Sequence, residues 1–369
     1  MVVNLFKISR QGKFDLYNYA ETGEQKMIKA GIIGATGYAG SELVRILSSH
    51  PDTVITYLGS HSYAGKKYSD IYPFFTGICD TILSDDNTEK AAGECDVLFL
   101  ALPHGIASSV VNEDILSKCF VIDLGADYRL HDVSVYEAWY KTEHKSKELL
   151  ESAIYGLPEL HREDIKKAKL VANPGCYTTC SILTLYPLLK YGLIENDSIV
   201  IDAKSGTSGA GRGEKTANLF CEVNESIKAY SVAGHRHTPE IEQELSLAAG
   251  EPIVLDFTPH LVPMQRGILS TCYAKLKDGV TKEDISKAYH KSYDGEAFIR
   301  LTEYLPETRF VRNTNRVDIA WKINSRTGRI TAMGAIDNLV KGAAGQAVQN
   351  MNILFGLKET TGLDAKGGV

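Results

Sequence analysis

The sequence predicts an α/β protein, with a doubly wound parallel sheet in its first half and an α+β domain in its second half. An apolar run at residues 28–33 leads into a glycine turn and then an amphipathic segment with Leu43 and Leu47 on one face, which is the pattern of strand, turn and helix. Further short apolar runs, bounded by turn residues like strands buried on both faces, lie at 54–58, 96–101 and 119–124. After about residue 173 the pattern changes to polar and aromatic alternation.

That alternation predicts the strands of the second domain, at 198–203, 253–260, 269–275 and 317–323. Residues 338–355 are spaced as a helix with one apolar face, which we expect to pack back on the first domain. The predicted divisions are an extension at 1–26, a first domain at 27–173, a second domain at 174–333 and a C-terminal helical segment at 334–369.

Composition limits the classes of function. The chain has 369 residues, of which 44% are hydrophobic and 23% charged, so it can bury an ordinary core. A formal net charge of -6 gives no general attraction for nucleic acid or anionic lipid, and no apolar run approaches the roughly 18 residues that span a bilayer. The seven cysteines form no CxxC pair, which predicts neither a disulfide framework nor a metal site. We therefore expect a cytoplasmic protein that acts on small molecules and holds no metal.

The extension at 1–26 is polar and contains tyrosines, and it has no apolar segment of the kind found in secretory signals. Met27 could serve as the start of the chain. Two interpretations stay open: a non-catalytic arm, or an artefact of cloning or of the assigned start site.

A nucleotide site is predicted at the glycine turn after the first strand. Its backbone amides and the positive end of the following helix would face a phosphate, as in dinucleotide-binding domains of the Rossmann type. The spacing is GxxGxxG rather than GxGxxG, and a merely tight turn is the alternative interpretation. The residues of the turn are Gly34, Ala35, Thr36, Gly37, Tyr38, Ala39 and Gly40.

The end of the second strand favours NADP over NAD. An NAD site usually carries a carboxylate there for the ribose hydroxyls, whereas this chain has Ser60 followed by Lys66, which suit a 2′-phosphate. The alternative is that these are ordinary loop residues. Pro103 and His104 follow the strand at 96–101, so we expect them at the edge of the cofactor site.

Cys176 is the predicted nucleophile. It follows Asn173, Pro174 and Gly175 and precedes an apolar helical run, which places it at a helix N-terminus. Free amides and the helix dipole there lower a thiol pKa and stabilise a neighbouring oxyanion. The other six cysteines have no comparable setting and are expected to be small buried hydrophobes.

A second cluster supplies the general acid and base that thiol chemistry needs. His235 and His237 lie two residues apart in a segment expected to be extended, so their side chains would point to the same side. Thr238 would cap the next helix, and Glu240 is available to orient one of the histidines. Structural histidines are the alternative interpretation.

Anion-binding groups are expected in two further segments. The glycine-rich loop that ends at Arg212 can wrap amides around an anion, and a flexible loop is the alternative. Arg129 follows a strand and can bind a carboxylate or phosphate, as Arg212 can, while Arg266 is a weaker candidate. The residues assigned to substrate are Arg129, Asn173, Ser205, Gly206 and Arg212, and those assigned to the cofactor include Ser208, Gly209 and Asn338.

Taken together, these segments resemble the N-acetyl-gamma-glutamyl-phosphate reductase family from Met27 onward. The motifs that carry the resemblance lie at 34–40, 101–105, 155–159, 173–177, 205–212, 235–240 and 334–342. The resemblance implies a glyceraldehyde-3-phosphate dehydrogenase-like fold, with Cys176 as nucleophile, His235 as acid/base, His237 as a pocket neighbour and Asn338 near the nicotinamide. It also implies an NADP-binding domain at 27–173 and a catalytic and oligomerisation domain at 174–333, in a homodimer or homotetramer.

The implied reaction is the NADPH-dependent reduction of N-acetyl-glutamyl 5-phosphate to the semialdehyde and phosphate through a cysteine thioester, in arginine biosynthesis. The same chemistry on N-acetyl-aminoadipyl phosphate or aspartyl phosphate stays open. So do two proteins of other classes: a non-catalytic NADP sensor, which needs no reactive thiol, and a cysteine hydrolase, which needs no nucleotide turn.

Overall fold

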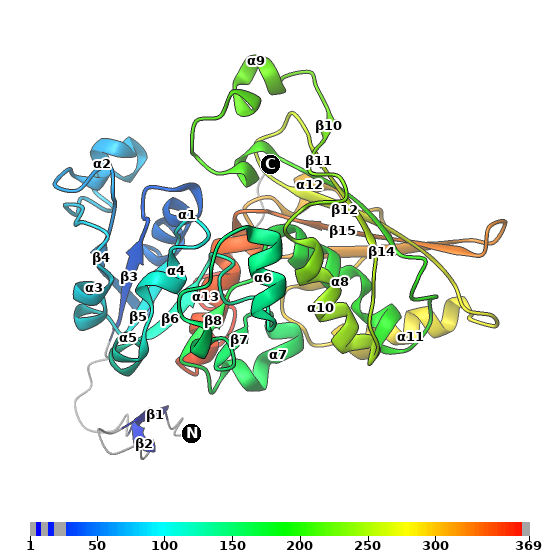
Figure 1. Ribbon diagram of the computed structural model, residues 1–369, viewed down its shortest axis with the longest axis horizontal. Helices are drawn as coiled ribbons and strands as arrows, with labels where there is room; N and C mark the ends of the chain where they lie inside the picture. Colours follow the sequence, from blue (N-terminus) through cyan, green and yellow to red (C-terminus); the bar gives the residue numbers. More distant parts are fainter. Residues whose placement is uncertain (1–4, 9–13, 18–26, 364–369) are drawn as a thin grey trace.

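The structure is a computed structural model that describes residues 5–8, 14–17 and 27–363 (Figure 1). Within the extension, strands β1 (Leu5–Ile8) and β2 (Phe14–Tyr17) pair antiparallel. The rest of the segment at 1–26, for which an arm or an artefact was considered, lies outside the described residues.

The first of the two large sheets has six strands, all parallel, in the order β4-β3-β5-β6-β8-β7. The central strand β5 has the sequence Val-Leu-Phe-Leu and is buried at every position, as expected where helices cover both faces. The order reverses at β3, and doubly wound sheets bind ligands at the carboxyl edge of such a reversal. The strands are β3 (Ile28–Ile33), β4 (Thr53–Leu58), β5 (Val97–Leu100), β6 (Phe120–Asp123), β7 (Ala153–Tyr155) and β8 (Leu170–Ala172).

Helices cover both faces of this sheet. One buried cluster joins α1 and α13 to one face, and another joins α3, α4 and α5 to the other. The helices of this half are α1 (Tyr38–Leu47), α2 (Tyr68–Ile71), α3 (Thr88–Glu94), α4 (Ala107–Val110), α5 (Glu113–Lys118), α6 (Val133–Tyr140) and α7 (Pro158–Ile165), with 3₁₀ turns at Pro73–Phe75 and Lys147–Leu149.

The second sheet has seven strands and mixed directions, in the order β10-β11-β9-β12-β15-β14-β13. Its long strands alternate between buried and partly exposed residues, because helices pack on only one face. The strands are β9 (Val200–Ser205), β10 (Lys228–Ala229), β11 (Asp256–Leu261), β12 (Ile268–Lys275), β13 (Ile299–Leu301), β14 (Val317–Asn324) and β15 (Arg329–Ile336).

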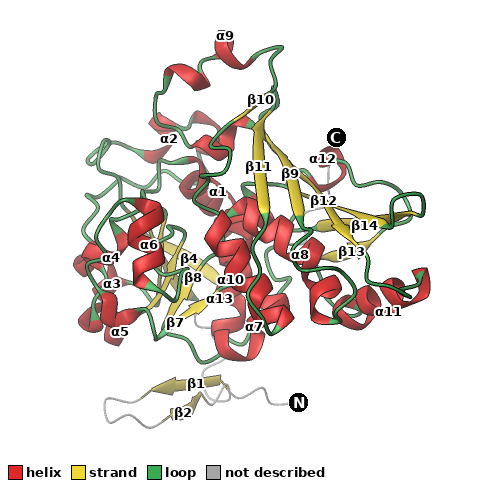
Figure 2. Cartoon of the chain, turned by 45° about the vertical axis from the view of Figure 1, so that its right-hand side comes forward, coloured by secondary structure: helices red, strands yellow, loops and turns green. Residues whose placement is uncertain are grey.

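Helix α8 is the central element of the second half, since it packs on β12, β15, α10 and α11. Helices α8, α10 and α13 lie between the two sheets (Figures 1 and 2). The elements of this half are α8 (Cys176–Lys190), α9 (Phe220–Val223), α10 (Thr238–Ala249), α11 (Lys282–Tyr293), α12 (Thr308–Val311), the π-helix η5 (Val340–Ala344) and α13 (Gly345–Leu354), with 3₁₀ turns at Thr207–Ala210 and Thr216–Asn218.

The predicted fold class is confirmed, and eight strands lie at or within a few residues of their predicted positions. The short strands β7, β8, β10 and β13 and the long strand β15 were not predicted. The tail at 338–355 is not one α-helix, because its first turn is the π-helix η5. It returns to the first half as expected, where α13 contacts α1 and α7.

Candidate active site

The nucleotide turn is built so tightly that two of its positions require glycine. Gly34 has a φ of 76°, and a Cβ there would lie 2.4 Å from the carbonyl oxygen of Ala101. A Cβ on Gly40 would lie 2.3 Å from the Gly34 carbonyl oxygen. Helix α1 begins directly after Gly37, and no side chain caps its first amides. Those free donors fit the pyrophosphate of a dinucleotide.

Polar and cationic groups gather beside this turn. The hydroxyls of Thr36 and Ser60 lie 2.9 Å apart, and the Lys66 ammonium lies 5.5 Å from the centre of the Tyr63 ring. Arg212 also lies at the nucleotide turn, since its Nη1 donates to the Thr36 carbonyl oxygen at 2.8 Å. The glycine loop that carries it reaches the first domain, and its role as a substrate ligand stays a prediction.

The carboxylate of Asp86, which was not among the predicted site residues, also reaches the turn. The Gly34 amide donates to Asp86 Oδ1 at 3.2 Å. Asp86 follows Ser84, which forms an isolated parallel bridge to Gly59 beyond the end of β4. No acidic residue follows the second strand directly in the sequence. The fold nevertheless brings Asp86 to the nucleotide turn from farther along the chain.

Pro103 and His104 lie in the loop between β5 and α4, at the carboxyl edge of the first sheet. The His104 ring lies 5.3 Å from the ring of Tyr140. Desolvation of the ring by its neighbours, together with the positive charges of Arg129 and Arg236, lowers the pKa of His104 to about 3, although the residue is exposed by surface area. The imidazole is therefore neutral near pH 7.

Cys176 is the first residue of α8, as predicted, with Gly175 as an uncapped N-cap. Burial raises the pKa of the Cys176 thiol to about 11, while the backbone amides of Tyr177 and Cys176 and the charge of Arg129 oppose that effect. The expectation of a lowered thiol pKa is therefore wrong in its net direction. A partly buried thiol with a raised pKa needs a proton acceptor before it can act as a nucleophile.

Two glycines let neighbouring elements approach this cysteine closely. A Cβ on Gly342, in the π-helix η5, would lie 2.7 Å from Cys176 Cβ. A Cβ on Gly175 would lie 2.5 Å from His237 Nε2. Cys176 thus lies between η5 on one side and the histidine segment on another, and π-turns within helices are frequent at functional sites.

The structure brings His235 and His237 together beside Cys176's helix. Their ring centres lie 4.8 Å apart, and the Tyr177 ring packs against both, at 5.7 Å from His235 and 6.1 Å from His237. The lead-in is not extended, because His237 has α-region angles and is itself the N-cap of α10 in place of Thr238. Burial lowers the pKa of His235 to about 4 and that of His237 still more, so both rings are neutral near pH 7.

Glu240 does not orient a histidine, which corrects the expected role of this residue. Its Oε1 accepts hydrogen bonds from the Gly175 amide at 2.9 Å, from the Thr178 hydroxyl at 2.9 Å and from the Tyr155 hydroxyl at 2.8 Å. Because Gly175 and Thr178 flank the nucleophile, Glu240 fixes the start of α8. It acts on Cys176 through the backbone rather than through an imidazole.

Arg129 is buried, with only 4% of its side chain exposed, and all three of its nitrogens are committed within the protein. Nε donates to the Asn173 carbonyl at 2.8 Å, Nη2 to the Leu124 carbonyl at 2.8 Å and Nη1 to Glu240 Oε2 at 3.3 Å. Its expected direct binding of substrate is therefore replaced by support of the loop before Cys176. Asn173, also assigned to substrate, instead bonds the Ala343 carbonyl through its Nδ2 at 3.2 Å.

The glycine-rich loop after β9 meets the segment after β15. Asn338 Nδ2 donates to the Ser208 hydroxyl at 3.0 Å, and Asn338 Oδ1 accepts from the Gly267 amide at 2.7 Å. The Gly206 amide bonds the Gly267 carbonyl at 2.9 Å, and the positions of Ser205 and Gly209 are fixed by their packing on this loop. These predicted cofactor and substrate residues therefore lie together around Asn338.

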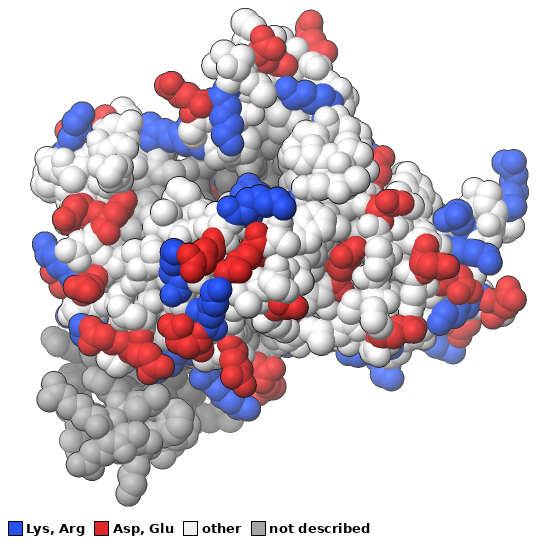
Figure 3. Space-filling model, viewed as in Figure 1, with Lys and Arg blue, Asp and Glu red and all other residues white. Residues whose placement is uncertain are grey.

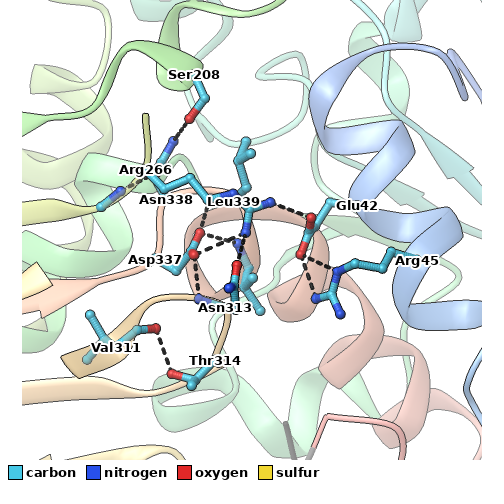
Figure 4. A network of polar contacts seen from close by, with 12 residues as sticks. Glu42, Arg45, Ser208, Arg266, Val311, Asn313, Thr314, Asp337, Asn338 and Leu339 are labelled. Carbon is cyan, nitrogen blue, oxygen red and sulfur yellow. Dashed lines mark hydrogen bonds and ion pairs between the residues drawn. The ribbon is translucent and has the colours of Figure 1, made fainter. Parts of the chain in front are cut away.

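Arg266 joins the two halves of the protein through the polar network drawn in Figure 4. Its guanidinium is paired with Glu42 of α1 and, at 3.2 Å, with Asp337 after β15. Both carboxylates are buried, and Asp337 also accepts the amides of Leu339 and Val340. Arg266 therefore ties the cofactor helix to the start of η5, and it is not free to bind an anion.

The chain matches two family descriptions in tandem: residues 29–168 match the semialdehyde dehydrogenase NAD-binding domain, and residues 176–338 match the semialdehyde dehydrogenase dimerisation domain. A protein of Lachnospira eligens named N-acetyl-gamma-glutamyl-phosphate reductase is 60% identical over 91% of this chain and 98% of its own length. The chain belongs to the N-acetyl-gamma-glutamyl-phosphate reductase family. Proteins of that name from Lachnoclostridium phytofermentans and Desulforamulus reducens are 58% and 52% identical, over 91% and 92% of this chain and 98% and 99% of theirs.

Solved structures extend the comparison to the fold. Aspartate semialdehyde dehydrogenase II of Vibrio cholerae has a TM-score of 0.67 at 17% identity and covers 89% of this chain and 98% of its own. The enzyme of Candida albicans, solved with NADP, has a TM-score of 0.66 at 19% identity, with 89% and 98% covered. This member of the N-acetyl-gamma-glutamyl-phosphate reductase family therefore shares the semialdehyde dehydrogenase fold, and a nicotinamide dinucleotide is its cofactor class.

On the face drawn in Figure 3, acidic and basic side chains are interspersed, and a recess lies beneath the lobe that carries α9. Among residues 5–8, 14–17 and 27–363, no helix is both long and apolar enough to cross a membrane. The same residues contain no cluster of three His, Cys, Asp or Glu side chains placed to hold a metal ion.

Proposed function

We propose that this chain reduces N-acetyl-L-glutamyl 5-phosphate to N-acetyl-L-glutamate 5-semialdehyde and phosphate, with NADPH, in arginine biosynthesis. Cys176 at the uncapped start of α8, enclosed by a histidine pair and by η5, is the observation that carries the proposal. The names of relatives at 52–60% identity support the substrate. We also propose that 27–173 binds the cofactor, that 174–333 carries the catalytic groups and the subunit contacts, and that the protein is a cytoplasmic homodimer or homotetramer.

In the proposed mechanism the sulfur of Cys176 bonds to the acyl carbon, the carbon–oxygen bond to phosphate breaks, and the thiol proton leaves with the phosphate. When bound, the reduced nicotinamide supplies the hydride that turns the thioester into an aldehyde. Collapse of the tetrahedral adduct returns the electron pair to Cys176, which regains a proton from solvent through the imidazole of His235. The free amides at the start of α8 stabilise the oxyanion in both steps, because they are already oriented before the reaction.

His235 is the proposed acid/base, and a backbone contact supports which nitrogen it uses. The His237 amide donates to His235 Nδ1 at 3.1 Å, so in the neutral ring the proton is on Nε2. That nitrogen can hydrogen-bond an oxygen of the substrate, whereas Nδ1 is occupied. His237 packs against Gly175, which suits a residue that shapes the pocket beside the nucleophile.

NADP rather than NAD is the proposed cofactor. Ser60 and Arg212 contact Thr36 of the nucleotide turn, and Lys66 and Arg212 both lie by the Tyr63 ring. A hydroxyl and two cations in this arrangement suit a 2′-phosphate. The Asp86 carboxylate also reaches the turn, where its Oδ1 accepts a hydrogen bond from the Gly34 amide. The proposal requires a higher kcat/KM with NADPH than with NADH.

The decisive assay follows NADP⁺ reduction at 340 nm with N-acetyl-glutamate semialdehyde, with and without phosphate. Phosphate-dependent turnover is expected, and turnover that does not need phosphate would contradict an acyl-phosphate product. The semialdehydes of N-acetyl-aminoadipate and aspartate serve as competing substrates, and a higher kcat/KM for either would replace the proposed one. Cofactor binding without turnover on any of them would favour the NADP sensor.

A further inference from the structure

The proposed substrate carries two anionic groups, a phosphate and a carboxylate. The arginines that the sequence analysis proposed as anion ligands are not all available to bind them. Arg129 and Arg266 are committed to carboxylates and carbonyl oxygens of the protein itself. Arg212 donates to the Thr36 carbonyl at the nucleotide turn. The substrate carboxylate therefore needs another cation close to Cys176 and the histidine pair.

Arg236 lies between the two histidines in sequence, and its guanidinium is uncommitted. Within the described part of the chain it makes no hydrogen bond or ion pair, and the side chain is exposed. Its Cζ lies 5.3 Å from the centre of the Tyr140 ring, and the Tyr140 hydroxyl donates to the Arg236 carbonyl at 3.4 Å. A stacked guanidinium still presents its in-plane N–H donors at its edge, which suits a planar carboxylate.

The surface beneath Arg236 is itself held in place. Tyr140 stacks on Tyr136 with ring centres 4.9 Å apart, and the Tyr136 hydroxyl donates to buried Asp127 at 2.8 Å. Tyr140 also contacts the His104 ring, which belongs to the loop at the edge of the cofactor site. Arg236 thus rests on a fixed aromatic stack that connects the histidine pair with the cofactor edge.

We propose that Arg236 binds the α-carboxylate of the substrate and so selects acyl phosphates that carry a carboxylate at the far end of the chain. This deepens the proposed function and rests on it. The leaving phosphate is attached to the carbon that Cys176 attacks, so it lies beside the amides at the start of α8. The carboxylate lies at the other end of the substrate, where an exposed guanidinium beside the histidines meets it.

The first test needs no turnover. Cys176 is alkylated with N-iodoacetylglycine, whose carboxylate is separated from the reacting carbon by three atoms as in the proposed substrate, and with the neutral N-iodoacetylglycinamide. The ratio of the two rates is compared between variants. In Arg236→Gln the N-iodoacetylglycine rate should fall roughly 10-fold relative to N-iodoacetylglycinamide, as expected for loss of a charge-assisted pair. Arg236→Lys should restore part of the ratio, and Arg326→Gln, an exposed arginine at the β14–β15 turn, should leave it unchanged.

The second test is steady-state kinetics in the direction of semialdehyde oxidation. Arg236→Gln should raise KM for the semialdehyde roughly 10- to 100-fold, with kcat within about 3-fold and KM for phosphate unchanged. An unchanged alkylation ratio overturns the proposal, and so does a rise in KM for phosphate in place of KM for the semialdehyde. If the reductase activity itself is absent, the alkylation ratio still decides whether Arg236 attracts a carboxylate to Cys176.

Discussion

Replacing Gly342 with alanine tests how closely η5 must approach the nucleophile. The added Cβ would lie 2.7 Å from Cys176 Cβ and 3.1 Å from Cys176 Cα, whereas carbon atoms in contact normally lie about 3.5–4.0 Å apart. Relief therefore needs a relative shift of about 0.8 Å or more. Since a misplacement of about 1 Å at a reacting group can lower a rate about 100-fold, kcat/KM should fall by roughly that factor.

The stability cost of Gly342→Ala should be modest by comparison. Overpacking a well-filled site costs about 1–3 kcal/mol, which in a chain of this length lowers Tm by several degrees. NADP binding should change less than about 2-fold, because the nucleotide turn is not displaced. The assays are kcat/KM, the rate of Cys176 alkylation by iodoacetamide, thermal unfolding and titration of the cofactor.

Gly93→Ala is the matched control. Gly93 lies in α3, where a new Cβ meets no atom within 4 Å, so activity should be unchanged and Tm equal or slightly raised. If Gly342→Ala keeps kcat/KM within twofold of the unmodified protein, the approach of η5 does not position Cys176. The packing argument would then be refuted, whatever the change in Tm.

Four further predictions concern the reacting groups and the cofactor. Cys176→Ser should abolish turnover and leave NADP binding nearly unchanged; appreciable residual turnover would remove the thiol from the mechanism. His235→Asn should chiefly lower kcat, by about 10²–10⁴-fold, and His237→Asn should chiefly raise KM, so exchanged phenotypes would assign the acid/base to His237. Because the pKa of the Cys176 thiol is about 11, its alkylation rate in the free enzyme should rise with pH from about 7 to 10, since deprotonation makes the thiolate; a plateau below about pH 8 would contradict this. Arg212→Gln should reduce the preference for NADPH over NADH, measured as the ratio of kcat/KM values, and an unchanged ratio would place the 2′-phosphate elsewhere.

Local patterns predicted the elements whose burial is complete or strictly periodic. The strands β3, β5 and β6 were recognisable because helices cover both faces, so each one consists mainly of buried apolar residues. The short strands β7 and β8 have three residues each, too few to show a period, and they were missed. The π-helix η5 was read as an ordinary helix, because a one-residue change in hydrogen-bond register leaves the apolar pattern nearly intact.

The site shows the same division between local and distant information. The sequence placed Cys176 at a helix start and paired it with two histidines, because helix capping and residue type are local properties. It did not show that Glu240 would hold the Gly175 amide or that Arg129 would be consumed in supporting that turn. Those partners are 65 and 111 residues apart from Glu240 in the chain, so only the packing of α10 against α8 brings them together.

The sequence by itself therefore determined the fold class, the nucleotide turn, the position of Cys176 at a helix start and, through its resemblance, the family. The tertiary structure decided which charges are free. Arg129, Arg212 and Arg266 look alike as anion ligands in sequence, yet the fold commits the first and third to buried carboxylates and carries Arg212 to the nucleotide turn. Burial likewise reversed the expected direction of the Cys176 pKa. The physical reason is that charge pairing and desolvation depend on distances between segments, which residue spacing along the chain does not specify.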